Sequence, residues 1–275
     1  MAGTPLTDAI NALTTYSNTV TGASDTTLSE AVATLASGYG GGGWTADGIA
    51  TGNEPYGAIV IDSASGLVEN AFNANGYMNN GTGITSLTLT NATEVPTGFC
   101  SNCRKLITAN LPKVTKINGS AFNYCTTMTS ISAPKVEELA GTYVISNCGQ
   151  LTNLTFPSLT AMNSGDALRN NGKVAVMDLN VIPSINPRAF SNDASLETLI
   201  LRNTSVVSLG NITAFDGTPA KVGGTGMNVY VPSALISTYQ TASNWSTIYA
   251  RNTMTFVAIE GSYYETHYGD GTPIT

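Results

Sequence analysis

Charged residues are scarce in this chain of 275 residues, because Asp, Glu, Lys and Arg make up 11% of it, against about 25% in an ordinary globular protein. Basic residues begin only at Arg104, and eight acidic residues precede it. Binding to a nucleic-acid backbone depends on clustered Lys and Arg, so this composition argues against a nucleic-acid partner. The missing basic residues also remove the positively charged start of a secretory signal peptide.

Long apolar runs are missing as well. No run approaches the ~18–20 residues of a membrane-spanning helix. The mean hydropathy is nevertheless +0.06, whereas disordered chains combine low hydropathy with high net charge. The composition therefore predicts a folded protein with a polar surface and no membrane span.

Residues that commonly carry catalysis or bind metals are few: the chain has four cysteines and one histidine, His267. A Ser-His-Asp arrangement or a His-ligated metal would depend on that residue alone. Cys100 and Cys103 form a single C-x-x-C, which indicates a redox or metal site only beside a second pair. Cleavage of a glycan needs two facing carboxylates about 5–9.5 Å apart, and no such pair emerges. We therefore expect no enzyme, no catalytic residue, no metal and no cofactor.

What the sequence does contain is a repeat with a period of 22 or 23 residues. One apolar column consists of Ile84, Leu106, Met128, Leu151, Val174 and Leu196. A second consists of Val95, Ile117, Leu139, Met162, Ile185 and Leu209. A third consists of Cys103, Cys125, Cys148, Asn171 and Asp193, which we interpret as buried core positions. In all three columns the spacing lengthens from 22 to 23 residues along the chain, and this agreement indicates stacked repeats.

Each unit reads as a short strand that a proline often follows, as in Leu106-x-x-Ala109-x-Leu111-Pro112. A unit of this length is too short to hold a sheet-crossing helix and two loops. It fits one turn of a coil whose turns stack and bury their apolar rows against each other. At ~4.8 Å per turn, seven turns make a rod roughly 35 Å long. The predicted fold class is a repeat solenoid, mainly β, with a parallel β-sheet.

The run Ala121-Phe122-x-x-Cys125-x-x-Met128-x-x-Ile131-x-x-Pro134 resembles the BspA-type leucine-rich repeat. The steps Asn102-Cys103 and Asn147-Cys148 match the Asn-Cys step of that family. The resemblance covers about residues 58–232, with a departure at Ala167-Leu168 and Asn171. It implies a leucine-rich-repeat-like solenoid and, since most members are surface proteins that bind host molecules or other cells, a binding function.

Two further regions flank the predicted solenoid of residues 44–232. Residues 1–43 read as two short amphipathic helices and a glycine joint, Gly40–Gly43, and we expect this region to serve attachment or oligomerisation. The first helix has Pro5 at its first position, and Thr27 and Glu30 form a capping box for the second. Residues 233–275 are expected to form a helical C-terminal cap, a possible strand over Met254–Ile259, and a tail.

Residues two apart on the predicted strands alternate with the buried positions and point outward. One outward row consists of Thr88, Asn110, Ser132, Thr155, Asp178 and Ile200, and the other of Ser86, Thr108, Ser130, Asn153, Val176 and Thr198. Short, mostly uncharged side chains of this kind lose little conformational entropy on binding. The candidate ligand-binding residues are Thr88, Asn110, Ser132, Thr155 and Asp178, with Tyr263, Tyr264 and Tyr268 of the tail. The alternatives are a water-facing strand surface for the rows, and a tail packed on the body for the tyrosines.

The resemblance also implies two settings for such a protein. Cell-surface members carry export signals and anchoring segments, which are not seen here, whereas export-free versions with a helical head resemble phage tail-associated or receptor-binding proteins of gut bacteria. We expect a virion component that contacts a bacterial surface glycan or protein through its repeats. Residues 1–43 would bind other tail proteins, and a homo-oligomer is expected by analogy with tail fibres. The alternatives are a cell-surface adhesin of the BspA type, on the extracellular surface, and a polysaccharide-cleaving tail enzyme.

Overall fold

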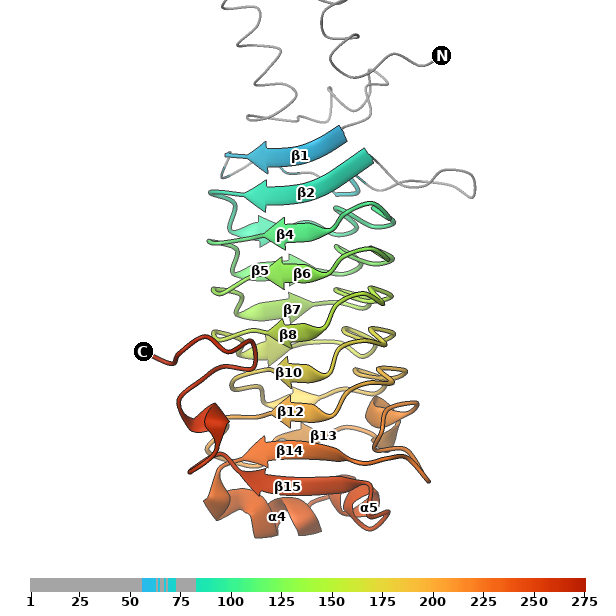
Figure 1. The fold of residues 1–275 in the computed structure, drawn as a ribbon, viewed down its shortest axis with the longest axis vertical. Coiled ribbons are helices and arrows are strands. Elements are labelled where there is room, and N and C mark those ends of the chain that lie inside the picture. The colour runs from blue at the N-terminus through green and yellow to red at the C-terminus, as the bar shows by residue number, and fades with distance from the viewer. Residues whose placement is uncertain (1–55, 63, 65–66, 68, 73–82) are drawn as a thin grey trace, which may run out of the picture.

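The computed structural model describes residues 56–62, 64, 67, 69–72 and 83–275. The helices and glycine joint expected within residues 1–43 lie outside these residues. The described chain winds into a coil whose turns stack along one long axis (Figure 1). Each repeat unit supplies one turn, so the prediction of a repeat fold with parallel sheets is confirmed.

One side of the coil carries a column of parallel strands, which we call the main strand column. Its first sheet has the order β1-β2-β4-β6, and its second the order β15-β14-β12-β10-β8. In the stack these two sheets follow each other directly (Figure 1). The bounds are β1 (Tyr56–Ile61), β2 (Gly83–Leu89), β4 (Thr108–Asn110), β6 (Ser130–Ser132), β8 (Asn153–Thr155), β10 (Val176–Asp178), β12 (Thr198–Ile200), β14 (Met227–Val231) and β15 (Met254–Ala258).

The opposite side of the coil carries a second strand column that the sequence did not predict. Its sheets have the orders β3-β5-β7-β9 and β11-β13. The bounds are β3 (Glu94–Val95), β5 (Lys116–Asn118), β7 (Glu138–Ala140), β9 (Ala161–Met162), β11 (Ser184–Ile185) and β13 (Ser208–Leu209). These strands contain the second apolar column of the repeat, for example Ile117 and Leu139, which pair in register. The two strand columns therefore face each other across the core.

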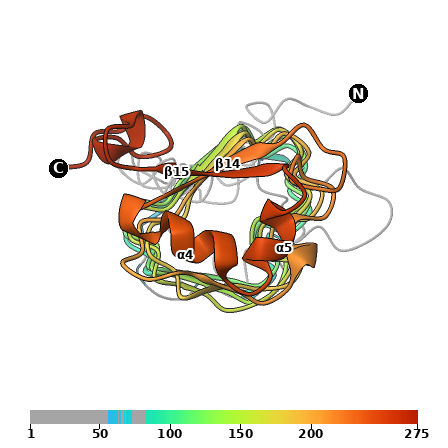
Figure 2. The same ribbon diagram turned by 90° about the horizontal axis from the view of Figure 1, so that it is seen from below.

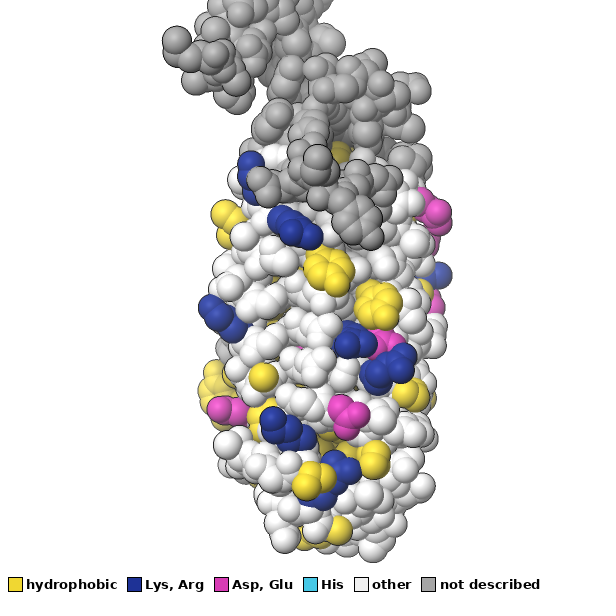
Figure 3. Space-filling model, turned by 90° about the vertical axis from the view of Figure 1, so that its right-hand side faces the viewer, with side chains coloured by type: hydrophobic (Ala, Val, Ile, Leu, Met, Phe, Trp, Pro, Cys, Tyr) yellow, Lys and Arg dark blue, Asp and Glu magenta, His cyan; other side chains and the backbone are white. Residues whose placement is uncertain are grey.

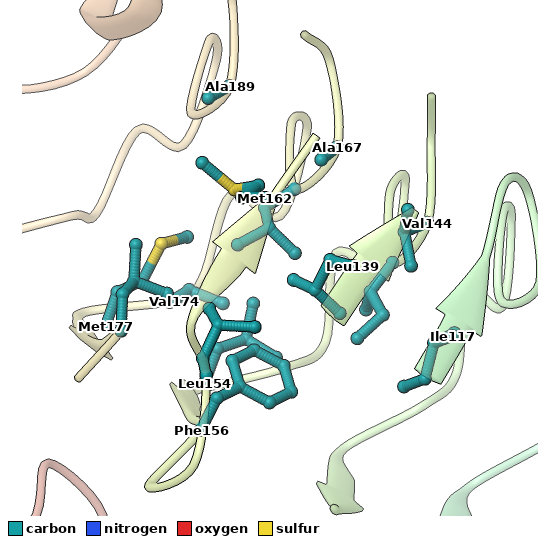
Figure 4. Packing of buried hydrophobic residues seen from close by; sticks show 14 of the residues in the cluster. Ile117, Leu139, Val144, Leu154, Phe156, Met162, Ala167, Val174, Met177 and Ala189 are labelled. Carbon is teal, nitrogen blue, oxygen red and sulfur yellow. The ribbon is translucent and has the colours of Figure 1, made fainter. Parts of the chain in front are cut away.

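The core fills the inside of the coil along its whole described length. Figure 4 shows Leu154 of β8, Phe156 directly after β8 and Met177 of β10 pointing toward Leu139 and Met162 of the second column. In the view along the axis the coil encloses this space (Figure 2). All six residues of the first apolar column are fully buried. Each turn thus buries its apolar row against its neighbours, as the repeat requires.

The corner between the strand columns contains a ladder of asparagine amides. Asn147 donates to Asn123 Oδ1 over 2.7 Å, Asn170 to Asn147 over 2.8 Å, and Asn192 to Asn170 over 2.9 Å. Asn147, Asn170 and Asn192 have positive φ angles of 58°, 60° and 64°. Asparagine tolerates this left-handed conformation better than most residues. Asparagine at these positions therefore fits the left-handed turn, and its side-chain amide hydrogen-bonds to the next asparagine of the ladder.

The C-terminal end of the stack is covered by short helices beneath β14 and β15 (Figures 1 and 2). The helical elements are η1 (Ile212–Phe215), η2 (Ser233–Leu235), α4 (Ile236–Thr241), α5 (Trp245–Tyr249) and η3 (Tyr263–Glu265). Tyr239 of α4 and Trp245 of α5 are buried, and their rings meet at 5.3 Å. Trp245 Nε1 donates to the Val207 carbonyl over 2.7 Å, and Tyr239 Oη accepts from the Val207 amide over 3.0 Å. The backbone N–H and C=O groups of the buried Val207 are thereby both hydrogen-bonded.

The expected strand over Met254–Ile259 is present as β15, which pairs with β14 in parallel register. The main sheet therefore continues past residue 232. After β15 the chain reverses, and residues 260–275, which we call the C-terminal segment, run back along the outside of the stack to the level of β8 (Figure 1).

Candidate functional site

The two outward rows predicted from the repeat are in register on the main strand column. Thr88 pairs with Asn110, Asn110 with Ser132, and Thr155 with Asp178. The second row pairs in the same way, from Ser86 through Thr108 to Ser130 and from Asn153 through Val176 to Thr198. Parallel strands lie ~4.8 Å apart, so each row presents one side chain per turn at that interval.

A groove lies on this face over β4, β6 and β8, with a volume of about 460 Å³. Asn110, Ser132, Asn153 and Thr155 form part of its floor, and Pro134 and Pro157 of the repeat's proline column also line it. Ala109, Ile131 and Ala133 line it as well. We call it the polar groove after its hydroxyl and amide side chains. It brings together three of the predicted residues, namely Asn110, Ser132 and Thr155; Thr88, one turn earlier, is half-buried and outside its lining.

One wall of the polar groove comes from the C-terminal segment, through Asp270 and Thr272. Asp270 Oδ1 accepts hydrogen bonds from the Thr272 amide over 2.9 Å and from its hydroxyl over 2.7 Å. Asp270 is the one charged residue in the described lining. The groove therefore joins strand residues to residues more than a hundred positions later in the chain.

Asp178 is not an exposed ligand-binding residue, contrary to the prediction. Its side chain is fully buried and forms an ion pair with Arg202 over 2.8 Å. Asp178 Oδ2 also accepts a hydrogen bond from the Gly269 amide over 3.0 Å. Ile200, the next residue of the row, is likewise fully buried. The C-terminal segment lies on this half of the face, so the outward row is open to solvent only toward the N-terminal half.

Arg202 ties the C-terminal segment to the sheet. Its guanidinium donates to the Tyr264 carbonyl over 2.7 Å and to the His267 carbonyl over 3.1 Å, besides its bond to Asp178. Its Cζ lies 5.4 Å from the centre of the Tyr268 ring, a cation–π arrangement. One side chain thus holds three points of the segment in place.

Gly269 lies where the segment approaches the strands most closely. A Cβ atom at this position would come within 2.9 Å of Asp178 Cβ and 3.0 Å of Val176 Cγ1. It would also lie 3.3 Å from Thr155 Oγ1, a buried atom without a hydrogen-bond partner in the described chain. Only a residue without a side chain fits this contact. Thr155 marks the boundary between the covered and the open parts of the face.

The tail tyrosines pack on the body rather than forming a free aromatic patch. The Tyr264 ring meets Tyr230 of β14 edge-on at 4.7 Å. Partial burial raises the pKa of Tyr264, and its hydrogen bond with Thr198 opposes that shift. Tyr263 is 57% exposed, and its ring stacks on His267 at 4.3 Å. Of the three predicted tyrosines, Tyr263 therefore presents the largest free surface.

The third repeat column is buried, as predicted. Cys103, Cys125 and Cys148 each donate from Sγ to a backbone carbonyl, those of Phe72, Cys100 and Phe122 respectively. All four cysteines are buried thiols, Cys100 included. Burial raises the pKa of Cys100 and of Cys125 well above the ordinary value. These thiols occupy core positions of the repeat.

Chemistry beyond binding finds little support in the described residues. His267 Nδ1 pairs with Thr266 Oγ1 over 2.8 Å, and no carboxylate of the described chain hydrogen-bonds to the ring. Within the same residues, no group of three or more His, Cys, Asp or Glu side chains is placed to hold a metal ion. Figure 3 shows that charged side chains on the right-hand face are scattered among uncharged ones and do not form a single patch.

The role of the C-terminal segment was missed, although the sequence contains a signal for it. The proline that follows the strand in three units, at Pro112, Pro134 and Pro157, is replaced by Asn180 and then by Arg202. The outward row changes from hydroxyl and amide side chains to Asp178 over the same units. An acidic and a basic residue that break two neighbouring columns together could have indicated a buried pair.

Two leucine-rich repeat proteins of known structure are similar to this chain. A leucine-rich repeat protein from T. pallidum is 20% identical, with a TM-score of 0.48, over 58% of this chain and 75% of that chain. A leucine-rich repeat protein from Bacteroides ovatus is 12% identical, with a TM-score of 0.23, over 54% of this chain and 55% of that one. A comparison with curated proteins gives no match. The sequence profile of the BspA type leucine rich repeat region matches in six copies over residues 77–219. Because this match spans more than half of the chain, the protein belongs to the BspA-type leucine-rich repeat family.

Proposed function

We propose that this protein is a non-enzymatic binding protein whose polar groove holds a saccharide chain on a bacterial surface. The observation that carries the proposal is the groove itself, which hydroxyl and amide side chains of β4, β6 and β8 line. Proteins of the BspA-type leucine-rich repeat family are typically found at cell surfaces or outside cells, which agrees with a role in surface contact.

The groove chemistry favours a saccharide over a protein. Asn110, Ser132 and Asn153 are exposed, short and uncharged, and they can both donate and accept hydrogen bonds. Asn110 and Ser132 are paired neighbours in one row, at the strand spacing of ~4.8 Å, which is close to the length of one pyranose unit in an extended chain. Protein interfaces centre instead on buried aromatic or arginine anchors, and the described lining contains none. A bacterial surface protein remains the alternative ligand.

A cleaving enzyme is not favoured by the same groove. Hydrolysis of a glycosidic bond uses two carboxyl groups on either side of the bond. The described lining contains one, Asp270. Asp178, the acidic residue among the predicted ligand-binding residues, is buried and paired with Arg202. These observations support binding without cleavage.

For the setting, we propose a receptor-binding component of a phage tail, in which residues 1–43 attach the protein to other tail proteins and α4 and α5 cap the coil. The proposed assembly is a homo-oligomer. The family match equally fits a cell-surface adhesin of the BspA type. No helix in the described part of the chain has both the length and the hydropathy needed to cross a bilayer. Deletion of residues 1–43 should abolish incorporation into tail particles; incorporation that survives the deletion contradicts the assigned role.

The binding proposal is tested by filling the groove. Ser132→Trp places an indole over its floor, whereas Ser208→Trp places the same side chain on an exposed strand position of β13 in the second strand column. Binding of labelled protein to intact bacteria should fall at least about tenfold for Ser132→Trp and remain unchanged for Ser208→Trp. Equal binding by both variants contradicts the groove as the site.

The class of ligand is tested by treating the bacteria before binding. Periodate cleaves the vicinal diols of saccharides, and protease digestion removes surface proteins. Binding that is lost after periodate and retained after protease supports a glycan. The opposite result supports the protein alternative. Release of reducing ends from the bound material would instead establish an enzyme.

A further inference from the structure

The C-terminal segment forms part of the polar groove. It covers β10 and β12, where Asp178 and Ile200 are fully buried, and it stops at the open half of the face. Beyond Gly269, Asp270 and Thr272 face the groove. The segment thus sets where the open face ends and supplies side chains at that boundary.

The buried pair of Asp178 and Arg202 fixes this arrangement. Arg202 is 14% exposed and Asp178 fully buried, so each charge depends on the other for its compensation. The bonds of the pair to the Tyr264 and His267 carbonyls and to the Gly269 amide all reach the C-terminal segment. In earlier turns the position of Arg202 holds a proline, such as Pro134 or Pro157, which cannot make such bonds. The pair is therefore specific to the turns on which the segment lies.

Asp270 is the group that this arrangement presents. Thr272 holds Asp270 Oδ1 through two hydrogen bonds, which fixes the orientation of the carboxylate. Asp270 is exposed, and its Oδ2 accepts from no residue of the described chain. The described lining contains no Lys or Arg to neutralise it. An oriented carboxylate beside neutral hydroxyl and amide groups attracts a ligand that carries one positive charge among many hydroxyl groups.

We propose that Asp270 is a specificity-determining residue of the polar groove and selects a saccharide with free amino groups, and that Arg202 and Asp178 are the positioning residues that hold it there. The inference rests on the proposed function. An ammonium group on the sugar donates a charge-assisted hydrogen bond to Asp270 Oδ2, while the sugar hydroxyls contact Ser132 and Asn110. An N-acetylated sugar lacks this charge, and an acidic sugar is repelled.

The probes are a hexamer of β-1,4-linked glucosamine, its fully N-acetylated counterpart, and a lysine hexapeptide, each titrated calorimetrically at low salt. The full-length protein should bind the glucosamine hexamer at least about tenfold more tightly than the N-acetylated one, as expected for a hydrogen bond to a charged group. The preference should vanish in high salt and above the pKa of the sugar amine. Tighter binding of the lysine peptide than of the glucosamine hexamer overturns the choice of a saccharide.

Asp270→Asn should remove the preference, because it takes away the negative charge and keeps a side-chain oxygen that can accept from Thr272. Asp216→Asn, a change at an exposed carboxylate outside the groove lining, should keep it. The paired change Asp178→Asn with Arg202→Met removes both buried charges together and avoids an uncompensated one. It should also reduce the preference, whereas general loss of structure would weaken both hexamers equally. A preference that persists in Asp270→Asn overturns the inference.

Failure of this inference is distinguishable from failure of the proposed function. Wild-type protein that shows no preference for the glucosamine hexamer overturns the role of Asp270. The proposed function is then judged by the binding of Ser132→Trp and Ser208→Trp to whole cells. Equal binding of those two variants contradicts the groove as the binding site, whatever the preference between the two hexamers.

Discussion

The carboxylate of Asp193 accepts a hydrogen bond from the backbone amide of Asn171 over 2.6 Å, one turn away in the same buried column. Asn171 makes the same bond to the preceding turn, since its Oδ1 accepts from the Cys148 amide over 3.0 Å. Both side chains thus accept a hydrogen bond from a backbone amide of the preceding turn, Asp193 through a carboxyl oxygen and Asn171 through an amide oxygen. Asn171 also donates from its amide to two carbonyls, whereas Asp193 Oδ2 is buried without a hydrogen-bond partner.

Asp193→Asn should therefore stabilise the protein at pH 7. Burial raises the pKa of Asp193 well above its ordinary value, and the bond from Asn171 opposes this only in part. A raised pKa means that the folded state holds the proton more tightly, so this stabilisation is present below pH ~3.9 and is lost as the pH rises. The gain from Asn should be about 1–3 kcal/mol in urea denaturation at pH 7 and should shrink toward pH 4. An equal effect at both pH values would show that ionisation is not the cause.

Asp166→Asn should have the opposite pH dependence. Asp166 pairs with Arg188 over 2.7 Å and with Arg169 over 2.8 Å, and these arginines lower its pKa, Arg188 most. A lowered pKa contributes stability above pH ~3.8–3.9 that is lost as the pH falls through the folded-state value. The variant should lose about 1–2 kcal/mol at pH 7, at the low end because Arg188 is exposed, and less at pH 3. Asp216→Asn serves as the control with an exposed carboxylate.

Gly269→Ala should release the C-terminal segment. The added methyl group would lie 2.9 Å from Asp178 Cβ, closer than carbon atoms can pack, so the segment must move. Hydrogen exchange over residues 263–275 should accelerate at least about tenfold while the repeats keep their protection. Gly149→Ala is the matched control, because a Cβ there meets nothing within 4 Å. Unchanged exchange in Gly269→Ala would contradict the close contact.

The four cysteines should be unreactive in the folded protein. All are buried, and burial raises the pKa of Cys100 and Cys125. Because the thiolate is the reactive form, an aromatic disulfide reagent at pH 8 should modify them slowly in buffer and completely in urea. Rapid modification of even one thiol in buffer would show that its layer of the core opens readily.

Much of the fold could be predicted from the sequence, because each turn repeats the same contacts. The columns that contain Leu106, Ile117 and Cys103 are all buried, and the outward rows pair in the predicted register. The strands of the second column were not predicted, because in most of them the column residue, such as Ile117, has no apolar residue two positions away and so shows no strand alternation. The burial of Ile117 was still evident from its column.

The candidate site was only partly predictable. Asn110, Ser132 and Thr155 line the groove because they belong to the repeat. The residues that cover Asp178 do not belong to the repeat. Gly269, which donates to Asp178, is 91 residues later in the chain, and the Tyr264 carbonyl, which accepts from Arg202, is 62 residues after Arg202. No period connects such residues, so the covering of Asp178 could not be found from spacing. A repeat predicts the contacts between neighbouring turns, but not which turns a non-repeating C-terminal segment will contact.

Because the C-terminal segment runs back along the stack, it limits where turns can be added to the repeat without moving the groove. The C-terminal segment starts after β15 and reaches back to β8, so the number of turns between these two strands fixes the position of Asp270. Turns inserted before β4 would lengthen the rod and leave the groove intact. Turns inserted between β8 and β14 would carry the carboxylate away from Ser132. The position of the groove is therefore set from the C-terminal end of the stack, and turns added at the N-terminal end change only the length of the rod.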